Sequence, residues 1–390
     1  MDVAALKDSP VGILVPVSGT DGRTGDTYDY EAFLPNPLSE TVDLSTETWN
    51  QVVAASSALT RLDQAGRQVP NPALLRRPSI RREAQSTSAL EGTHAAFTDL
   101  LDADIDEDQS PSAAVTEVLN YVRAAEQAFD WIVERPITKT LLCELQAMLV
   151  RGTDGDLPDA GGIRSRQVLI GPQGCSVGEA RFVPPPAGDQ LQAGLDQWIT
   201  WVNEPGELPA VVRSALAHYQ FEALHPFSDG NGRIGRLVIV LHLMRAGVLS
   251  EPLLVVSPWF EARRHEYQDQ LLALSQTGDF NAWIQFFCQG LEAQANHTAS
   301  KIQQLLSFQT DLREMVRQGA ITGTAAKITE DLIGVPVVSP KWAARRYDVS
   351  YQAANTAIAK LVENGILVEI TGRTYRRVFA SRQVLRIVES

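Results

Sequence analysis

Several kinds of residue and segment are scarce in this sequence, and each scarcity argues against a class of protein. Cysteine occurs only three times in 390 residues, at Cys143, Cys175 and Cys288. An odd number at such wide spacing argues against a disulfide framework and against a cysteine-based metal site. No apolar run approaches the ~18 residues of a membrane span, and the first residues lack the basic and apolar regions of a secretory signal. We therefore expect a cytoplasmic protein without a membrane segment.

Positive charge is scarce as well. The formal net charge is −13, which argues against a protein that coats nucleic acid in a general way. The charge is unevenly distributed, because residues 321–390 contain ten Lys and Arg against six Asp and Glu, a net +4 that leaves −17 for the rest. A chain of 390 residues can hold two or three domains. The change in character near residue 320 predicts a separate C-terminal domain.

Helical periodicity fills most of the remaining chain. Residues up to about 45 are rich in Pro, Gly, Asp and Thr, which predicts an irregular arm. Acidic residues between 99 and 108 are expected in a solvated connection between helices. The spacing of apolar residues predicts helices at about 46–65, 80–92, 112–133, 138–151, 188–203, 209–224 and 263–278, and a further helix that contains Trp283.

The densest chemistry lies in residues 225–236, which read HPFSDGNGRIGR. The two glycines cannot continue a helix comfortably, and the apolar run at 237–244 predicts a buried helix directly after them. The turn therefore presents its amides at a helix N-terminus, which attracts anions. Arg233 and Arg236 lie three apart, so their guanidinium groups share one face of that helix. An imidazole, a carboxylate, two guanidinium groups and these amides predict a nucleotide-phosphate site.

The same twelve residues match the signature H-x-F-x-D/E-G-N-G-R-x-x-R at every fixed position. The chain therefore resembles the Fic family, whose enzymes transfer AMP from ATP to a protein hydroxyl. The resemblance implies that His225 is the general base. It also implies that Asp229 holds a Mg²⁺ ion between the α- and β-phosphates, while Phe227 anchors the loop in the core.

The phosphate ligands follow from the same resemblance. Arg233 and Arg236 are expected to clamp the β- and γ-phosphates through their planar forks. The amides that meet the developing phosphate charge are expected from Gly230, Asn231 (which would also use its side chain) and Gly232. In the Doc branch of the family, which phosphorylates its target, a lysine stands where this chain has Gly232. AMP transfer is accordingly the favoured reaction, and phosphate transfer is the alternative.

A second motif lies upstream of the signature. Residues 87–92, TSALEG, match the inhibitory motif S/T-x-x-x-E-G/N of the family class with an N-terminal inhibitory helix. Thr87 and Glu91 are spaced i, i+4 and so face the same side, and Gly92 is a natural helix stop. The resemblance implies that Glu91 reaches Arg236, in a bidentate pair, and occupies the place of the γ-phosphate. The alternatives are that Glu91 ends a helix in solvent, or that it positions a water that removes AMP from a modified protein.

Two further assignments concern the target and the adenosine. Short extended runs at 163–170 and 180–183, separated by a Gly- and Pro-containing turn, predict a β-hairpin. In the family such a hairpin is the flap that docks the target strand. The resemblance implies docking by Gln167, Val168, Leu169 and Ile170, whereas the alternative is a surface hairpin without that role. Tyr267 stands where relatives carry a tyrosine near the adenosine, and it can equally belong to the core.

The C-terminal region resembles a winged helix-turn-helix. Helices at 342–347 and 351–363, the second capped by Ser350, precede strands at 366–370 and 375–379. Residues expected to face outward are Tyr351, Gln352, Asn355 and Thr356 on the second helix and Arg373, Arg376 and Arg377 on the wing. One interpretation is a DNA-binding domain with wing arginines on phosphates. The other is a docking or dimerisation module.

The sequence thus predicts a mainly α protein with a Fic-type helical core, a short β-hairpin flap and a small C-terminal winged helix-turn-helix. The predicted domains are an N-terminal arm and helices including the inhibitory helix at 1–110, a catalytic core at 111–315 and the winged domain at 320–390. The predicted activity is AMP transfer to a Tyr, Thr or Ser hydroxyl of a target protein or of the chain itself. The predicted partners are ATP, Mg²⁺ and that target, with DNA and a second copy of the chain left open. A transcription regulator that uses the nucleotide-binding core as a sensor is the alternative from another class.

Overall fold

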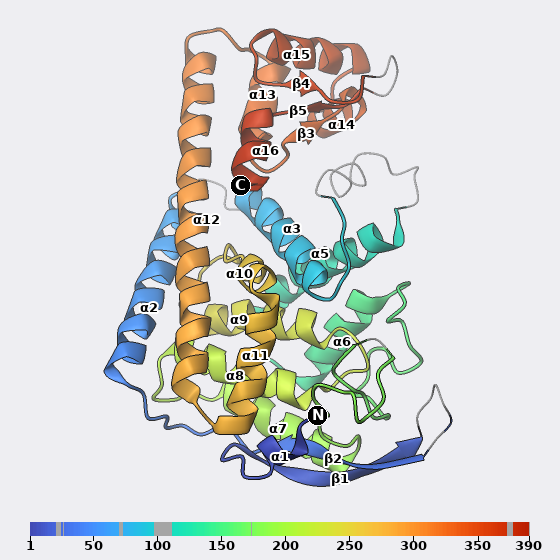
Figure 1. The fold of residues 1–390 in the computed structure, drawn as a ribbon. Coiled ribbons are helices and arrows are strands. Elements are labelled where there is room, and N and C mark those ends of the chain that lie inside the picture. Colours follow the sequence, from blue (N-terminus) through green and yellow to red (C-terminus); the bar gives the residue numbers. More distant parts are fainter. Residues whose placement is uncertain are drawn as a thin grey trace.

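The structure is a computed structural model that describes residues 1–20, 25, 27–69, 73–96, 111–172, 174–372 and 377–389. The expected acidic connection at 99–108 and the wing residues Arg373 and Arg376 lie outside the described residues. The described chain is mainly helical, as predicted, and the long helix α12 (Phe280–Arg317) runs along most of the molecule (Figure 1). Within the described residues, no helix has the length and apolar composition required to span a membrane.

The other helices before α12 match the predicted positions within a few residues, except for the start of α3 and for α1 and α10, where no helix was predicted. They are α1 (Val3–Leu6), α2 (Thr46–Arg67), α3 (Ala73–Leu90), α5 (Ala113–Ile132), α6 (Lys139–Val150), α7 (Asp189–Asn203), α8 (Ala210–Leu224), α9 (Asn231–Arg245), α10 (Ser257–Ala262) and α11 (Arg264–Thr277). Three of these helices begin where a hydroxyl side chain accepts a first-turn amide, at Ser45, Ser112 and Thr138. Such caps satisfy donors that have no partner within the helix.

Helix α3 begins at Ala73 instead of Ile80, with Pro78 inside it. A proline in a helix removes one backbone donor and disfavours the helix by about 3 kcal/mol. The burial of Leu75, Ile80 and Ala84, on a helix that packs against α5 and α10, offsets that cost. The predicted helix start at residue 80 was therefore wrong, because tertiary packing outweighs the local preference.

Helices α8 and α9 form the centre of the core and pack against each other. Almost every residue from Val211 to Phe221 and from Arg233 to Leu243 is buried. A helix that is buried all round shows no polar face. The short loop that joins these two helices, residues 225–230, is consequently held at both ends by the most rigid part of the molecule.

The N-terminal region is a β-hairpin, and the predicted irregular arm was wrong for these residues. Strands β1 (Gly12–Thr20) and β2 (Thr27–Pro35) pair antiparallel, with Gly12 opposite Pro35 and Thr20 opposite Thr27. Val15 and Val17 are buried in β1 while the residues between and after them are exposed, which is the period-2 pattern of a strand. Figure 1 shows this hairpin at one end of the molecule.

The predicted flap hairpin is reduced to a single antiparallel bridge between Ile170 and Phe182. The run 163–169 is not a strand because Arg164 ties it elsewhere. The buried Arg164 guanidinium donates to the carbonyl oxygens of His225 (2.8 Å) and Pro185 (2.6 Å). The segment is therefore fastened to the loop between α8 and α9 and not to a second strand.

The C-terminal region follows the predicted order of a helix, a turn, a second helix and two strands. Its elements are α13 (Thr324–Asp331), β3 (Val337–Val338), α14 (Pro340–Tyr347), α15 (Tyr351–Glu363), β4 (Val368–Glu369), β5 (Phe379–Ala380) and α16 (Arg382–Glu389). The strands are shorter than predicted, and the sheet order is β3-β5-β4. The last helix, α16, returns to pack on α12 and α3, as Figure 1 shows. The winged helix-turn-helix assignment and the division into three domains stay predictions.

Candidate active site

The loop between α8 and α9 is bounded by two residues in the left-handed region. His225 has φ 49° and ψ 60°, and Gly230 has φ 83°. Glycine adopts this region without cost, whereas a histidine there is strained and needs support from its surroundings. Arg164 supplies that support, because its side chain binds the His225 carbonyl (2.8 Å) and its amide binds the Pro226 carbonyl (3.0 Å).

The His225 imidazole is held in the neutral form. Its Nδ1 lies 3.3 Å from the Glu222 carbonyl oxygen, so a proton on Nδ1 leaves the Nε2 lone pair available as an acceptor. Burial lowers the pKa of His225 to about 4, and the positive charge of Arg164 adds to this effect. A neutral imidazole is the form that a general base requires.

Asn231 holds the loop closed. Its Oδ1 accepts from the Phe227 amide and its Nδ2 donates to the Phe227 carbonyl, both at 2.8 Å. Phe227 is fully buried, which agrees with its predicted role as an anchor. The Asn231 side chain is therefore bonded within the loop, and its contact with phosphate stays a prediction.

Asp229 presents its carboxylate at the surface of the loop, with 41% of the side chain exposed. Its oxygens accept from the Gly230 amide (2.7 Å) and from Arg233 Nη2 (3.1 Å). Gln146 of α6 fixes its backbone by donating to the Asp229 carbonyl (3.1 Å). Among the described residues there is no cluster of three or more metal-ligating side chains. One exposed carboxylate fits Mg²⁺ bound jointly with phosphate oxygens, which is how this ion is usually held at nucleotide sites.

Arg233 is buried and paired with Glu117 of α5, at 2.6 Å. Glu117 also accepts from the Thr93 hydroxyl at 2.9 Å, so it joins the segment after α3 to the signature helix. Sequence reasoning missed Glu117, because it lies 116 residues from Arg233 and no motif marks it. The two arginines share a helix face, as expected, but different elements hold them.

Arg236 is held by the two residues of the upstream motif. Its guanidinium is 2% exposed, and its Nη2 lies 2.6 Å from Glu91 Oε1. The Arg236 Nε donates to Thr87 Oγ1 (2.7 Å) and its Nη2 to the Thr87 carbonyl (3.1 Å). The structure thus brings Thr87, Glu91 and Arg236 together as predicted. Glu91 binds Arg236 through one carboxylate oxygen, Oε1, instead of the expected bidentate pair, and Thr87 supplies the other acceptors.

The backbone conformation at the end of α3 places the Glu91 side chain next to Arg236. Glu91 directly follows the last helical residue, and Gly92 has φ 98°. The Gly92 amide binds the Ala89 carbonyl (3.0 Å) and the Thr93 amide binds the Ser88 carbonyl (2.9 Å), which is the Schellman arrangement that ends many helices.

The environment of Glu91 keeps it charged. Burial raises the pKa of Glu91, but the charges of Arg236 and Arg233 more than offset this, so the pKa lies below its ordinary value. Gly232 makes room for the carboxylate, because a Cβ atom at this position would overlap Glu91 Oε1. The site therefore contains a carboxylate ion packed against the turn that precedes the arginines.

Tyr267 lies in the core, which is the second of its two predicted roles. Its side chain is buried, its hydroxyl lies 2.7 Å from His218 Nε2 and its ring stacks on Phe260 at 4.6 Å between centroids. The ring is buried among core side chains, and the contact of Tyr267 with adenosine stays a prediction. Glu222 lies in the same buried layer, where burial raises its pKa to about 8.

The predicted docking residues Gln167, Val168, Leu169 and Ile170 are all half-buried. Gln167 donates to the Pro184 carbonyl at 2.9 Å, and Ile170 forms the bridge to Phe182. Among the described residues, no backbone hydrogen bond to another strand is formed at 167–169. The backbone of the described residues 167–169 is therefore not paired with a strand, although the Val168 carbonyl accepts from the Gln167 side chain.

Comparison with known proteins gives two family matches. Residues 49–130 match the family described as Fic/DOC family N-terminal, and residues 136–243 match the Fic/DOC family. The first match contains Thr87 and Glu91, and the second contains the whole signature loop.

Curated relatives match a shorter region. Protein adenylyltransferase fic-1 of Caenorhabditis elegans is 31% identical over 142 residues, which is 36% of this chain and 25% of that protein. Protein adenylyltransferase Fic of Culex quinquefasciatus is 35% identical over 133 residues, 34% of this chain and 23% of that protein. The chain therefore matches only about a quarter of the length of these relatives.

Solved structures share the fold. A Fic family protein from Desulfovibrio desulfuricans G20 superimposes with a TM-score of 0.56 at 19% identity, covering 88% of this chain and 98% of that one. Fic-1 (aa134–508) from C. elegans gives a TM-score of 0.50 at 20% identity, covering 66% of this chain and 74% of that one. At these identities the likeness concerns the fold alone.

Proposed function

The chain belongs to the Fic/DOC family, and from this premise we propose that it transfers AMP from ATP to a hydroxyl group of a protein. The observation that carries the proposal is the meeting of a neutral His225 imidazole, the exposed Asp229 carboxylate and two arginines at one loop. Curated relatives that match about a third of the chain are named protein adenylyltransferases.

In the proposed reaction, His225 Nε2 accepts the proton of a Tyr, Thr or Ser hydroxyl of the target. The hydroxyl oxygen attacks the α-phosphorus of ATP, the bond from that phosphorus to the bridging oxygen breaks, and pyrophosphate leaves. The amides of residues 230–232 lie at the N-terminus of α9, where developing negative charge is stabilised. Mg²⁺ held by Asp229 and phosphate oxygens would neutralise part of the triphosphate charge.

The triphosphate needs the arginines that Glu91 and Glu117 now engage. We propose that Glu91 is a brake, because its carboxylate takes a donor of Arg236 that the γ-phosphate would otherwise use. The Glu91 contact of 2.6 Å with the buried Arg236 guanidinium and the space left by Gly232 support this role. A charged carboxylate at this place also repels the incoming phosphates.

The target is proposed to dock at residues 167–170. An extended target segment can pair with backbone groups of these described residues that are not paired with a strand, and such pairing tolerates varied target sequences. Because Arg164 ties this segment to the His225 carbonyl, a docked hydroxyl lies close to the base. Removal of AMP assisted by Glu91 and DNA binding by the C-terminal region stay predictions.

The experiment that tests the reaction compares ATP labelled at the α- and γ-phosphates in the Glu91→Gly variant. We expect protein-bound label from α-labelled ATP alone, and a mass gain of one AMP group. Label from γ-labelled ATP would indicate phosphate transfer instead. His225→Ala in the same background should abolish labelling while nucleotide still binds, and persistent labelling would overturn the role of His225.

A further inference from the structure

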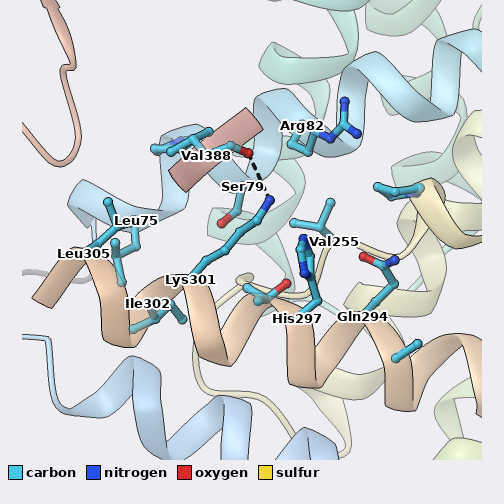
Figure 2. A pocket seen from close by; sticks show the side chains of 14 residues that line it. Leu75, Ser79, Arg82, Val255, Gln294, His297, Lys301, Ile302, Leu305 and Val388 are labelled. Carbon is cyan, nitrogen blue, oxygen red and sulfur yellow. Dashed lines mark hydrogen bonds between the residues drawn. The ribbon is translucent and has the colours of Figure 1, made fainter. Parts of the chain in front are cut away.

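A cavity of about 360 Å³ lies at the end of α3 that is remote from Glu91. Helices α3, α12 and α16 and the segment before α10 form its walls, and Figure 2 shows the side chains that line it. A volume of this size is in the range of cavities that hold small organic molecules. None of the roles proposed above uses it.

The floor and walls of this cavity are apolar. Leu75 of α3, Ile302 and Leu305 of α12 and Val388 of α16 are each less than a tenth exposed. These side chains offer a surface to an apolar molecule of matching size. They come from three helices that are far apart in the sequence, so the cavity exists only where the C-terminal helix meets α3 and α12.

The polar side of the cavity is basic. Arg82, His297 and Lys301 line it, and no acidic side chain lines it among the described residues. In Figure 2, Lys301 and His297 rise from α12 toward α3, and Lys301 reaches the Val388 carbonyl at 3.0 Å. Arg82 donates to Gln85 Oε1 at 2.9 Å, which carries no charge. Among the described residues, none of these three groups forms an ion pair with an acid.

The three basic groups disfavour one another's positive charge. Burial lowers the pKa of Lys301 to about 8, and the charge of Arg82 adds to this. Burial also lowers the pKa of His297, with Lys301 and Arg82 contributing. An anion inside the cavity would relieve this mutual repulsion and would replace part of the lost hydration.

We propose that the cavity binds a small organic anion, with an apolar body against Leu75, Ile302 and Leu305 and an acid group beside Lys301 and Arg82. The apolar walls select against inorganic anions, and the basic side selects against neutral molecules. The site therefore recognises an amphipathic carboxylate, sulfonate or phosphate ester.

The position of this site links it to α3 as a whole. One end of α3 supplies Leu75 and Arg82 to the cavity, and the other end supplies Thr87 and Glu91 to Arg236. A ligand that contacts α3 together with α12 and α16 biases the position of α3, and such coupling acts equally in both directions. This coupling rests on the brake role proposed for Glu91, whereas binding itself does not.

The test of binding uses the full chain and the fluorescent anion 8-anilinonaphthalene-1-sulfonate as probe. We expect saturable binding at one site and a loss of about tenfold in affinity in Lys301→Met, which keeps the apolar stem but removes the charge. Lys327→Met is the matched control, because Lys327 is exposed on α13, and it should bind the probe like the wild type. Unchanged affinity in Lys301→Met would overturn the proposal.

A second probe and a second variant locate the site. The neutral N-phenyl-1-naphthylamine should bind wild type and Lys301→Met equally and more weakly than the sulfonate. Ser79→Trp, on the α3 side of the cavity, should exclude both probes, provided that circular dichroism shows a folded chain. Wild-type binding in a folded Ser79→Trp variant would place the probe elsewhere and contradict the proposal.

The coupling has its own readout that needs no enzymatic activity. The dissociation constant of the sulfonate probe should differ by about fivefold or more between wild type and Glu91→Gly. Equal constants, with Lys301→Met still weakened, would remove the coupling and leave the binding site in place.

Discussion

The two arginines of the signature lie three residues apart and are equally buried, yet the carboxylates that hold them differ. Glu117 reaches Arg233 from within α5, and its side chain is only 15% exposed. Glu91 reaches Arg236 from just beyond the end of α3, and 40% of its side chain is exposed. A residue inside a capped helix, as Glu117 is, moves with that helix, whereas a residue beyond a helix end can leave by local unwinding. This difference predicts that Glu91 leaves Arg236 more easily than Glu117 leaves Arg233.

The largest expected effect is on labelling, and it follows from removal of the Glu91 carboxylate alone. Glu91→Gly should raise α-label incorporation by about tenfold to a hundredfold, because a charge-assisted hydrogen bond contributes about 1.5–3 kcal/mol and its loss releases Arg236 for phosphate. The measurement is labelling at limiting Mg·ATP. Equal labelling of variant and wild type at every ATP concentration would remove the brake.

Replacing each glutamate by the isosteric glutamine allows the two contacts to be compared directly. Glu91→Gln should raise labelling with little loss of stability, because its side chain is partly exposed. Glu117→Gln should leave labelling at or below the wild-type level and lower the free energy of unfolding by about 1–3 kcal/mol, because the buried Arg233 guanidinium loses its shorter charged contact and retains only the one with Asp229. Urea unfolding measures the free energy of unfolding of both variants, and the labelling assay measures their activity. Similar behaviour of the two variants would end the distinction drawn between Arg233 and Arg236.

A third carboxylate near these arginines, Glu222, is expected to be protonated and so to make the stability of the fold depend on pH. Burial raises its folded-state pKa to about 8 from an ordinary value of 4.5, so the folded protein retains a proton that the unfolded chain releases. This contribution to stability is complete below about pH 4.5 and is lost as the pH rises toward 8. Glu222→Gln cannot ionise, so we expect it to gain stability relative to wild type between pH 5 and pH 9. Urea titrations at both pH values test this, and a constant difference would contradict the assigned protonation.

The smallest expected effect concerns the turn that places Glu91. Gly92 has φ 98°, a region that disfavours a side chain by about 1 kcal/mol. Gly92→Ala should therefore weaken the Glu91 contact and raise labelling by roughly fivefold or less. Gly247→Ala is a control with a similar strain, at φ 70° and away from the site, and it should leave labelling unchanged. An equal response of both variants would indicate a general loss of stability instead.

The helices around the site could be predicted from the sequence, because each carries its own apolar period and caps, as Ser112 and Thr138 do. The contact of Glu91 with Arg236 was predicted from the resemblance of residues 87–92 to the inhibitory motif of the family, and the helical spacing added that Thr87 faces the same side. The flap was not, since the shape of residues 163–170 depends on Arg164 bonds to carbonyls about sixty residues away. Glu117 could not be predicted either, because only tertiary packing brings α5 to α9. The β1–β2 hairpin was missed because its Pro- and Gly-containing composition concealed the alternation of Val15 and Val17.

The absence of a side chain at Gly232 limits which residues can replace it when Glu91 is present. The carboxylate of Glu91 occupies the volume that any Cβ at this position would fill. A lysine there, as in the phosphorylating Doc branch of the family, would displace the carboxylate and would also alter the amides that face the phosphates. The residue at position 232 therefore affects both the group that is transferred and the inhibition proposed for Glu91, so a single substitution there changes both.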